Sequence, residues 1–292
     1  MADEVDLVLD VRAELGEGPI WDPDAGQLVW VDIQAGRLHR TDPSTGADST
    51  LEVGRPVGSV ALRRDGGLIL ATDDGFRLLD PGASETRLLT AVEADRRLTR
   101  MNDGKVDPAG RFWAGTMARD EGPGLGTLYR LDPNGTPTAM VTPIGISNGL
   151  DWADDGTTMY YIDTLAQSVD TFRYDLATGS ISDRRVHIAF DRQRDGGPDG
   201  LTLDAEGFLW VALWDGWCVR RYAPDGTLDR EVRLPVARVT SVTFGGHTYE
   251  DLYITSAWKD LPAADRAAQP LAGGIFHCRP GVAGRPLWRY AG

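Results

Sequence analysis

The sequence predicts an all-β protein, a six-bladed β-propeller formed as one domain by residues 1–292. Three observations predict this fold: a polar turn ending in glycine recurs along the chain, a short apolar run follows each turn, and helical periodicity is almost absent. The five turns are Asp22–Gly26, Arg64–Gly66, Asp107–Gly110, Asp154–Gly156 and Asp204–Gly207. Their glycines lie 40, 44, 46 and 51 residues apart, which is the spacing of propeller blades.

The apolar runs are rich in branched and aromatic residues, as β-strands are. They read LVWVDI, LILATD, RFWAGT, MYYIDT and FLWVAL, and a weaker sixth copy, LYITSA, follows a turn without a terminal glycine. A second turn marker follows the copies, as in TDPSTG, LDPGAS, LDPNG, YDLATG and YAPDG, and indicates hairpins between outer strands. Six units of about 49 residues with about four strands each indicate a propeller, with a long sandwich or solenoid as the alternative.

Two segments stand outside the repeat. Residues 5–11, VDLVLDV, have no blade of their own, so we expect them to pair with the last blade near Pro286–Tyr290 and close the ring. The stretch 261–269, LPAADRAAQ, has the helical pattern that the rest of the chain lacks, and Pro262 is suited to begin a short helix there.

Composition excludes several classes of protein. Hydrophobic residues make up 41% of the chain, which excludes wholesale disorder, and a net charge of −14 disfavours nucleic-acid or membrane partners. Two cysteines, Cys218 and Cys278, form no CxxC pair for zinc or an iron–sulfur cluster. Neither a signal peptide nor an apolar run of ~20 residues is visible. We therefore expect a cytoplasmic protein, monomeric or weakly homo-oligomeric.

The repeat register identifies candidate site residues at one mouth of the channel. Counting back eight residues from the turn glycine gives Gly58, Asn102, Asn148 and Asp199, and the longer first turn gives Glu17 at nine. Two carboxylates and two amides at equivalent positions would converge on one axis. There the carboxylates would repel each other and the amides would stay unsatisfied unless a hard divalent cation were bound. The alternative for any single Asx-Gly pair is an ordinary turn.

These residues lie in motifs that resemble the senescence marker protein/gluconolactonase/luciferin-regenerating enzyme-like (regucalcin-like) family. The motifs are LGEGPIW, RMNDGKVDPAGRFWAGTM, ISNGLDW, YYIDT, PDGLTLDAEGFLWVA and QPLAGGIF, and they cover the chain from about Leu15 to its end. The resemblance implies a six-bladed propeller with one divalent metal, calcium foremost and zinc, manganese, magnesium or iron as alternatives. It implies that the metal ligands are Glu17, Asn148 and Asp199, that Asp199 is also the catalytic acid/base, and that Arg100 and Asn102 contact substrate.

One segment departs from the family pattern. Many relatives carry Glu after GTMAE. This chain reads GTMARDEGPG, which places Arg119 and then Asp120 at this point. We assign the substrate contact to Asp120, whose side chain is one methylene shorter, with Glu121 as the alternative.

The resulting expectation is a metal-dependent hydrolase that opens sugar-acid lactones such as gluconolactone or a pentonolactone. The cation would act as a Lewis acid while Asp199 moves the proton. The alternatives are another metal-dependent esterase or phosphotriesterase-like hydrolase on the same scaffold, and a non-catalytic calcium-binding propeller. The four histidines are scattered, and no HExxH, GxSxG, Walker or GxGxxG motif is present. Trp214, in the loop after FLWVAL, is a candidate for the pocket wall.

Overall fold

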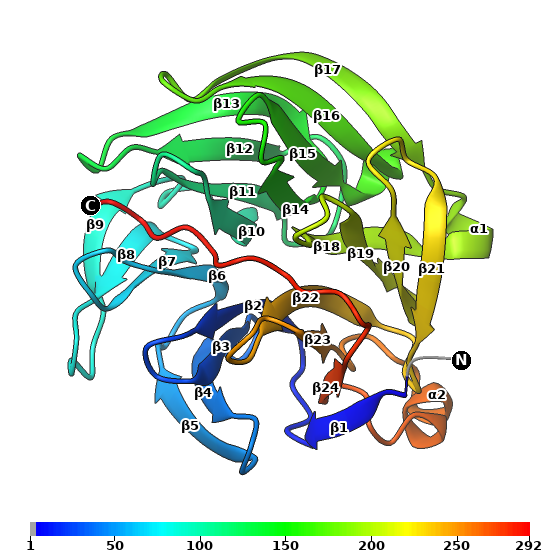
Figure 1. Cartoon of the computed structure of the whole chain (residues 1–292). Helices are drawn as coiled ribbons and strands as arrows, with labels where there is room; N and C mark the ends of the chain where they lie inside the picture. Colours follow the sequence, from blue (N-terminus) through cyan, green and yellow to red (C-terminus); the bar gives the residue numbers. More distant parts are fainter. Residues whose placement is uncertain (1–3) are drawn as a thin grey trace.

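The computed structural model describes residues 4–292, which form six four-stranded antiparallel sheets arranged around a central axis (Figure 1). The innermost strands of neighbouring sheets contact one another around the whole ring, so the propeller predicted from the repeat is confirmed. The first three blades contain the strands β2 (Gly16–Asp22), β3 (Gln27–Asp32), β4 (Arg37–Asp42) and β5 (Ala47–Glu52); β6 (Val57–Leu62), β7 (Leu68–Thr72), β8 (Gly75–Leu79) and β9 (Arg87–Ala91); and β10 (Thr99–Val106), β11 (Phe112–Ala118), β12 (Gly126–Leu131) and β13 (Pro137–Ile144).

The other three blades continue the same pattern. They contain β14 (Ser147–Trp152), β15 (Thr158–Asp163), β16 (Ser168–Asp175) and β17 (Ser180–Ala189); β18 (Gly197–Leu203), β19 (Leu209–Trp214), β20 (Cys218–Tyr222) and β21 (Leu228–Arg233); and β22 (Val239–Gly245), β23 (Asp251–Ser256), β24 (Ile275–Cys278) and β1 (Asp6–Leu9). The helices are the 3₁₀ turn η1 (Thr164–Ala166), α1 (Arg192–Asp195) and α2 (Ala263–Ala268). The sequence predicted α2 but gave no signal for the single turn of α1.

The repeated turns have a clear stereochemical basis. All five turn glycines have positive φ, from +64° to +87°, a region that side chains with a Cβ disfavour. In two blades the first residue of the turn also holds the next strand, because Asp107 and Asp204 accept hydrogen bonds at 2.9 Å from the indole Nε1 of Trp113 and Trp210. Each of these aspartates is fully buried, so the turn and the core are fixed together.

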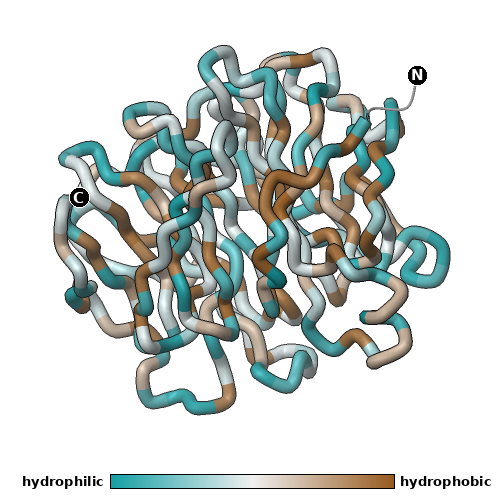
Figure 2. The backbone as a smooth tube through the Cα atoms, turned by 90° about the horizontal axis from the view of Figure 1, so that it is seen from below, coloured by the Kyte–Doolittle hydropathy of each residue, from teal (hydrophilic) through white to brown (hydrophobic). Residues whose placement is uncertain are grey.

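The core lies in the seams between blades. Each of six apolar clusters joins residues of two neighbouring sheets, as Trp210 of β19 and Phe244 of β22 do with ring centroids 5.7 Å apart. Figure 2 shows the apolar residues along the strands and the hydrophilic ones mainly in the loops. No helix between residues 4 and 292 has the length and apolar character needed to span a bilayer.

The N-terminal segment completes the sixth blade, but not where the sequence predicted. Strand β1 pairs antiparallel with β24, with Leu7 opposite Phe276. Residues 286–290 instead cross the end of the ring opposite the site described below (Figure 1), where Tyr290 N donates to Leu62 O at 2.8 Å. The N-terminal strand does pair with the last blade, but the predicted place near Pro286–Tyr290 was wrong. Tyr290 is buried and Leu287 and Trp288 are partly buried against the seams of blades 1 to 4, which leaves the edge of β24 for β1.

Candidate active site

All six innermost strands carry a bulge at the same point of their pairing with the second strand. The interruptions lie between Glu17 and Ile20, Val57 and Ser59, Met101 and Gly104, Ser147 and Leu150, Pro198 and Leu201, and Val239 and Ser241. A bulge releases a residue from the ladder and redirects its side chain. Of the positions that the register predicted, Gly58, Asn102, Asn148 and Asp199 lie in these bulges, whereas Glu17 is still paired with Val31 and directly precedes the bulge in β2. Thr240 lies in the sixth bulge, which the sequence missed because its copy lacks the turn glycine.

The glycines that follow the site residues do not form turns. Gly149 and Gly200 lie inside β14 and β18, and a Cβ on Gly149 would come within 2.4 Å of Leu201 N in the neighbouring strand. They are required because adjacent innermost strands approach closely near the axis. In β6 the bulge residue is itself Gly58, where a Cβ would lie 2.4 Å from Asn102 O, so the second blade contributes no side chain.

One cavity of about 410 Å³ opens at this end of the channel. It brings together five residues that the sequence assigned to the site, Glu17, Arg100, Asn102, Asn148 and Asp199, and each of them is at most 5% exposed. Trp214 forms part of the wall, as the sequence suggested. The other lining residues are Leu15, Met117, Glu121, Ile146, Thr164, Leu165, Gln167, Arg192 and Lys259.

Hydrogen bonds orient the two amides. Arg100 Nη1 donates to Asn102 Oδ1 at 2.6 Å, and Asn102 Nδ2 donates to Ser147 O at 2.8 Å and to Asn148 Oδ1 at 3.1 Å. Asn148 Nδ2 donates to Thr164 Oγ1 at 2.8 Å. The Asn102 amide therefore has both N–H groups committed within the protein, and its remaining capacity toward a substrate is as an acceptor.

The carboxylates at the floor of the cavity repel one another. Burial, and next the charge of Asp103, raise the pKa of Glu17 to about 8. Burial, followed by the charges of Glu17 and Asp103, raises the pKa of Asp199 well above its usual range. Asp199 Oδ1 is buried and accepts no hydrogen bond from residues 4–292.

This donor set fits a hard divalent cation. A cation would satisfy the orphaned Asp199 oxygen and offset the repulsion between Glu17 and Asp199, and carboxylate and amide oxygens suit Ca²⁺, Mg²⁺ or Mn²⁺. Within the described chain no group of three or more His, Cys, Asp or Glu side chains has metal-holding geometry. The amide oxygen of Asn148 would therefore complete such a site together with the two carboxylates.

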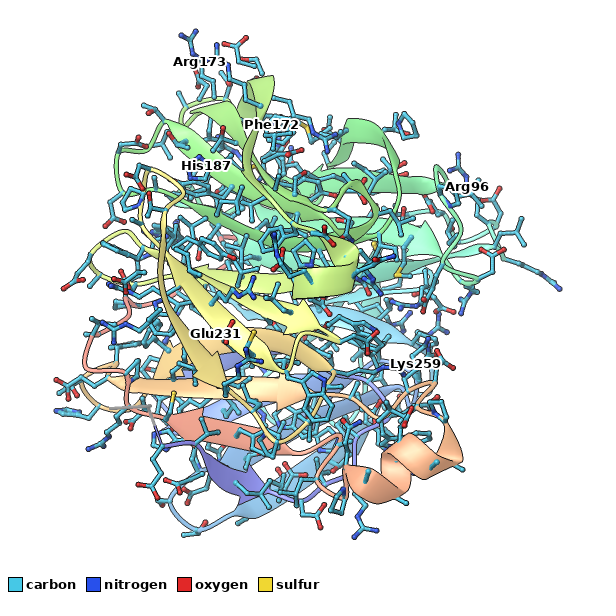
Figure 3. All side chains as sticks on the ribbon, turned by 90° about the vertical axis from the view of Figure 1, so that its right-hand side faces the viewer. Arg96, Phe172, Arg173, His187, Glu231 and Lys259 are labelled. Atoms are coloured by element: carbon cyan, nitrogen blue, oxygen red, sulfur yellow. The ribbon has the colours of Figure 1, made fainter. Side chains whose placement is uncertain are left out.

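The structure does not bring Asp120 into the cavity. The chain reverses here with Glu121 at φ +59°, and the Asp120 carboxylate turns back to accept from Gly122 N at 3.0 Å. Glu121 lines the cavity instead, and its carboxylate accepts a hydrogen bond from Lys259 Nζ at 2.7 Å. Lys259 belongs to the loop between β23 and α2 (Figure 3), so this ion pair joins the third and sixth blades, which face each other across the mouth.

Apart from Trp214 and Glu121, sequence reasoning missed the polar cavity residues that lie outside the innermost strands: Thr164, Gln167, Arg192 and Lys259. They belong to loops that differ in length and composition between blades, so the repeat register carries no signal for them. The histidines lie outside the cavity, as expected. His39 and His277 bind Asp48 and Asp251 at 2.7 and 2.8 Å, whereas His187 Nε2 is buried without a hydrogen-bond partner among the described residues.

Comparison with known proteins agrees with the motifs. Residues 15–258 match the SMP-30/Gluconolactonase/LRE-like region. Regucalcin of Oryctolagus cuniculus is 41% identical over 296 residues, which cover 99% of each chain. Two solved structures are similar: a calcium-binding protein, regucalcin, from Agrobacterium tumefaciens (TM-score 0.94, 31% identity, 99% of this chain and 97% of that one) and a luciferin-regenerating enzyme (TM-score 0.92, 30% identity, 99% of both). The chain belongs to the SMP-30/gluconolactonase/LRE-like family.

Proposed function

We propose that this protein is a divalent-metal-dependent hydrolase that opens sugar-acid lactones to the free acids. The observation that carries the proposal is the buried set of Glu17, Asn148 and Asp199, in which one oxygen of Asp199 has no hydrogen-bond partner among the described residues. Membership of a family that includes gluconolactonases supports the same reaction class. The cavity volume of about 410 Å³ suits a small molecule.

Glu17, Asn148 and Asp199 would hold the cation, with calcium as the foremost candidate. When bound, the cation would supply Lewis-acid stabilisation of the negative charge that develops on the lactone carbonyl oxygen. Asp199 would accept a proton from the attacking water and return it to the ring oxygen as the C–O bond breaks. This transfer produces one carboxylic acid and one hydroxyl group, so no other co-reactant is needed.

The polar wall would orient the sugar. Arg100 is buried at the cavity, where its Nη1 donates to Met101 O and Asn102 Oδ1, and the other guanidinium nitrogens would donate to lactone oxygens. Asn102 Oδ1 would accept from a hydroxyl group, and Glu121 would do so at the mouth. We assign the substrate contact to Glu121 rather than Asp120 because only Glu121 lines the cavity.

A non-catalytic calcium-binding role is the second candidate, favoured by the description of the Agrobacterium relative as a calcium-binding protein. A substrate panel of gluconolactone, pentonolactones, an aryl ester and a phosphotriester, assayed with and without a chelator, separates the possibilities. The proposal expects lactone opening that is lost with chelator and restored by a divalent cation. Calcium binding without turnover of any substrate would favour the second candidate, and preferential turnover of the phosphotriester or aryl ester would assign a different hydrolase.

A further inference from the structure

Thr164 is a cavity residue with a fixed backbone position. It begins η1, directly after β15, and is 6% exposed. Thr164 N donates to Ile146 O at 3.0 Å. The preceding residue, Asp163, accepts hydrogen bonds from Gly145 N and Ile146 N at 3.0 Å and from Leu165 N at 3.2 Å. The start of η1 is therefore fastened to the segment that leads into β14, the strand that carries Asn148.

The Thr164 hydroxyl forms hydrogen bonds with two residues at the proposed cation site, Asn148 and Pro198. It donates to Pro198 O at 2.8 Å and accepts from Asn148 Nδ2 at 2.8 Å. A hydroxyl has one hydrogen, so the bond to Pro198 obliges it to act as an acceptor toward Asn148. This fixes the nitrogen of the Asn148 amide against Thr164 and directs its oxygen to the other side. Pro198 is the residue directly before Asp199.

The arrangement is part of a directed chain of hydrogen bonds. It runs from Arg100 Nη1 to Asn102 Oδ1, from Asn102 Nδ2 to Asn148 Oδ1, from Asn148 Nδ2 to Thr164 Oγ1, and from Thr164 Oγ1 to Pro198 O. Rotating the Asn148 amide would place its NH₂ group against the Asn102 donor and its oxygen against a hydroxyl already committed to Pro198. Such a chain holds each member in one orientation.

We propose that Thr164 is a positioning residue, which orients the Asn148 amide so that its oxygen, and not its nitrogen, faces the bound cation. The hydroxyl also fixes the peptide carbonyl that precedes Asp199. The inference rests on the proposed function in that it requires a cation at Glu17, Asn148 and Asp199.

The test is calcium titration of the full chain by calorimetry, which does not depend on turnover. Thr164→Val keeps the side-chain shape and removes the hydroxyl, and we expect calcium affinity to fall roughly 10- to 100-fold, as for other residues that orient a metal ligand. Thr164→Ser keeps the hydroxyl and should restore most of the affinity. Thr164→Ala provides the same comparison where the valine does not fold.

Thr41→Val is the matched control. Thr41 is fully buried in the first blade, accepts from Trp30 Nε1 at 2.9 Å and donates to Asp48 Oδ1 at 2.6 Å, away from the cavity. It should lower the melting temperature without changing calcium affinity. In an Asn148→Ala background, Thr164→Val should cause a smaller further loss of affinity, because there is no amide to orient and only the bond to Pro198 O remains to be lost.

Three results would overturn the assignment: wild-type calcium affinity in Thr164→Val, an equal loss in Thr41→Val, or an undiminished further loss in the Asn148→Ala background. A wild-type protein that binds neither calcium nor manganese would instead overturn the proposed function, and this inference with it. A wild type that binds calcium but opens no lactone would contradict the proposed reaction alone.

Discussion

Asp199 has two assigned roles that a single substitution separates. Asp199→Asn retains an oxygen for the cation but removes the proton acceptor, so kcat should fall by roughly 10²–10⁴ at saturating calcium. Metal affinity should also fall, because the site loses one negative charge, and the assay must therefore include a calcium titration. Asn148→Asp is the control, since it adds a charge and should tighten metal binding. Near wild-type turnover of Asp199→Asn at high calcium would make Asp199 a ligand only and direct attention to Glu17 or Asp103.

The neighbours Asp120 and Glu121 provide a matched pair at the mouth of the cavity. Glu121→Gln replaces the carboxylate that would accept from a substrate hydroxyl with a weaker, neutral acceptor. At a partly exposed position a charged interaction is worth about 0.2–1 kcal/mol, so KM for a lactone should rise by up to roughly fivefold. Asp120→Asn should leave KM unchanged because its carboxylate faces Gly122 N outside the cavity. Steady-state kinetics on both variants provide the test. The reverse pattern would return the substrate contact to Asp120.

The buried carboxylates make the effect of calcium depend on pH. The pKa of Glu17 is raised to about 8 in the folded protein from 4.5, so the cation-free fold retains a proton that the unfolded chain releases. Stability of the cation-free protein should therefore decline as pH rises from about 4.5 to 8. Calcium would bind the ionised carboxylates, so its stabilisation should be larger at pH 8 than at pH 5. Melting curves with calcium and with chelator at both pH values test this, and an equal shift at both would contradict it.

At the scale of the strand, the site depends on a bulge next to a glycine. Gly149→Ala would place a Cβ 2.4 Å from Leu201 N and 2.7 Å from Asp199 O. We expect a loss of about 1–3 kcal/mol of unfolding free energy, together with weaker calcium binding, because the strain falls on the Asp199 backbone.

Gly82→Ala is the control for this substitution. Gly82 has φ +74° and open space around it, so alanine should cost about 1 kcal/mol through backbone strain and leave calcium binding intact. Urea unfolding and calorimetry measure the two effects. Unchanged calcium affinity in Gly149→Ala would show that the innermost strands separate without disturbing the site.

For the molecule as a whole, the C-terminal segment joins the blades at the end opposite the cavity. Arg285 binds Asp151 at 2.8 Å, Ala291 N donates to Gly110 O at 3.0 Å, and Tyr290 is fully buried between the second and third blades. Tyr290→Ala should cost roughly 3–5 kcal/mol, as large aromatic truncations do.

Arg289→Ala serves as the neighbouring control. Its partner Asp24 is mostly exposed at 2.7 Å, so the loss should stay below about 1 kcal/mol. Denaturant unfolding of both variants tests the comparison. Equal, small effects would mean that the segment is not required to hold the ring together.

The repeat allowed much of the molecule to be predicted from sequence. Propeller blades repeat local structure, and equivalent positions of equivalent blades point to one axis, so Glu17, Asn102, Asn148 and Asp199 could be grouped before any coordinates. Turn glycines and aromatic strands are likewise local signals. The family motifs added Arg100, which the register alone does not reach.

Only the tertiary structure decided the contacts between non-repeating segments. Glu121 and Lys259 are 138 residues apart and meet because two opposite loops bend toward one mouth. The left-handed backbone at Glu121 places that side chain, and not Asp120, at the cavity. The C-terminal segment packs across the end of the ring opposite the cavity, and β24 pairs with β1 instead. Sequence determined the strands and the channel register because these depend on local, periodic preferences. The loop contacts and the closing pair depend on where irregular segments lie in space, and periodicity carries no information on that.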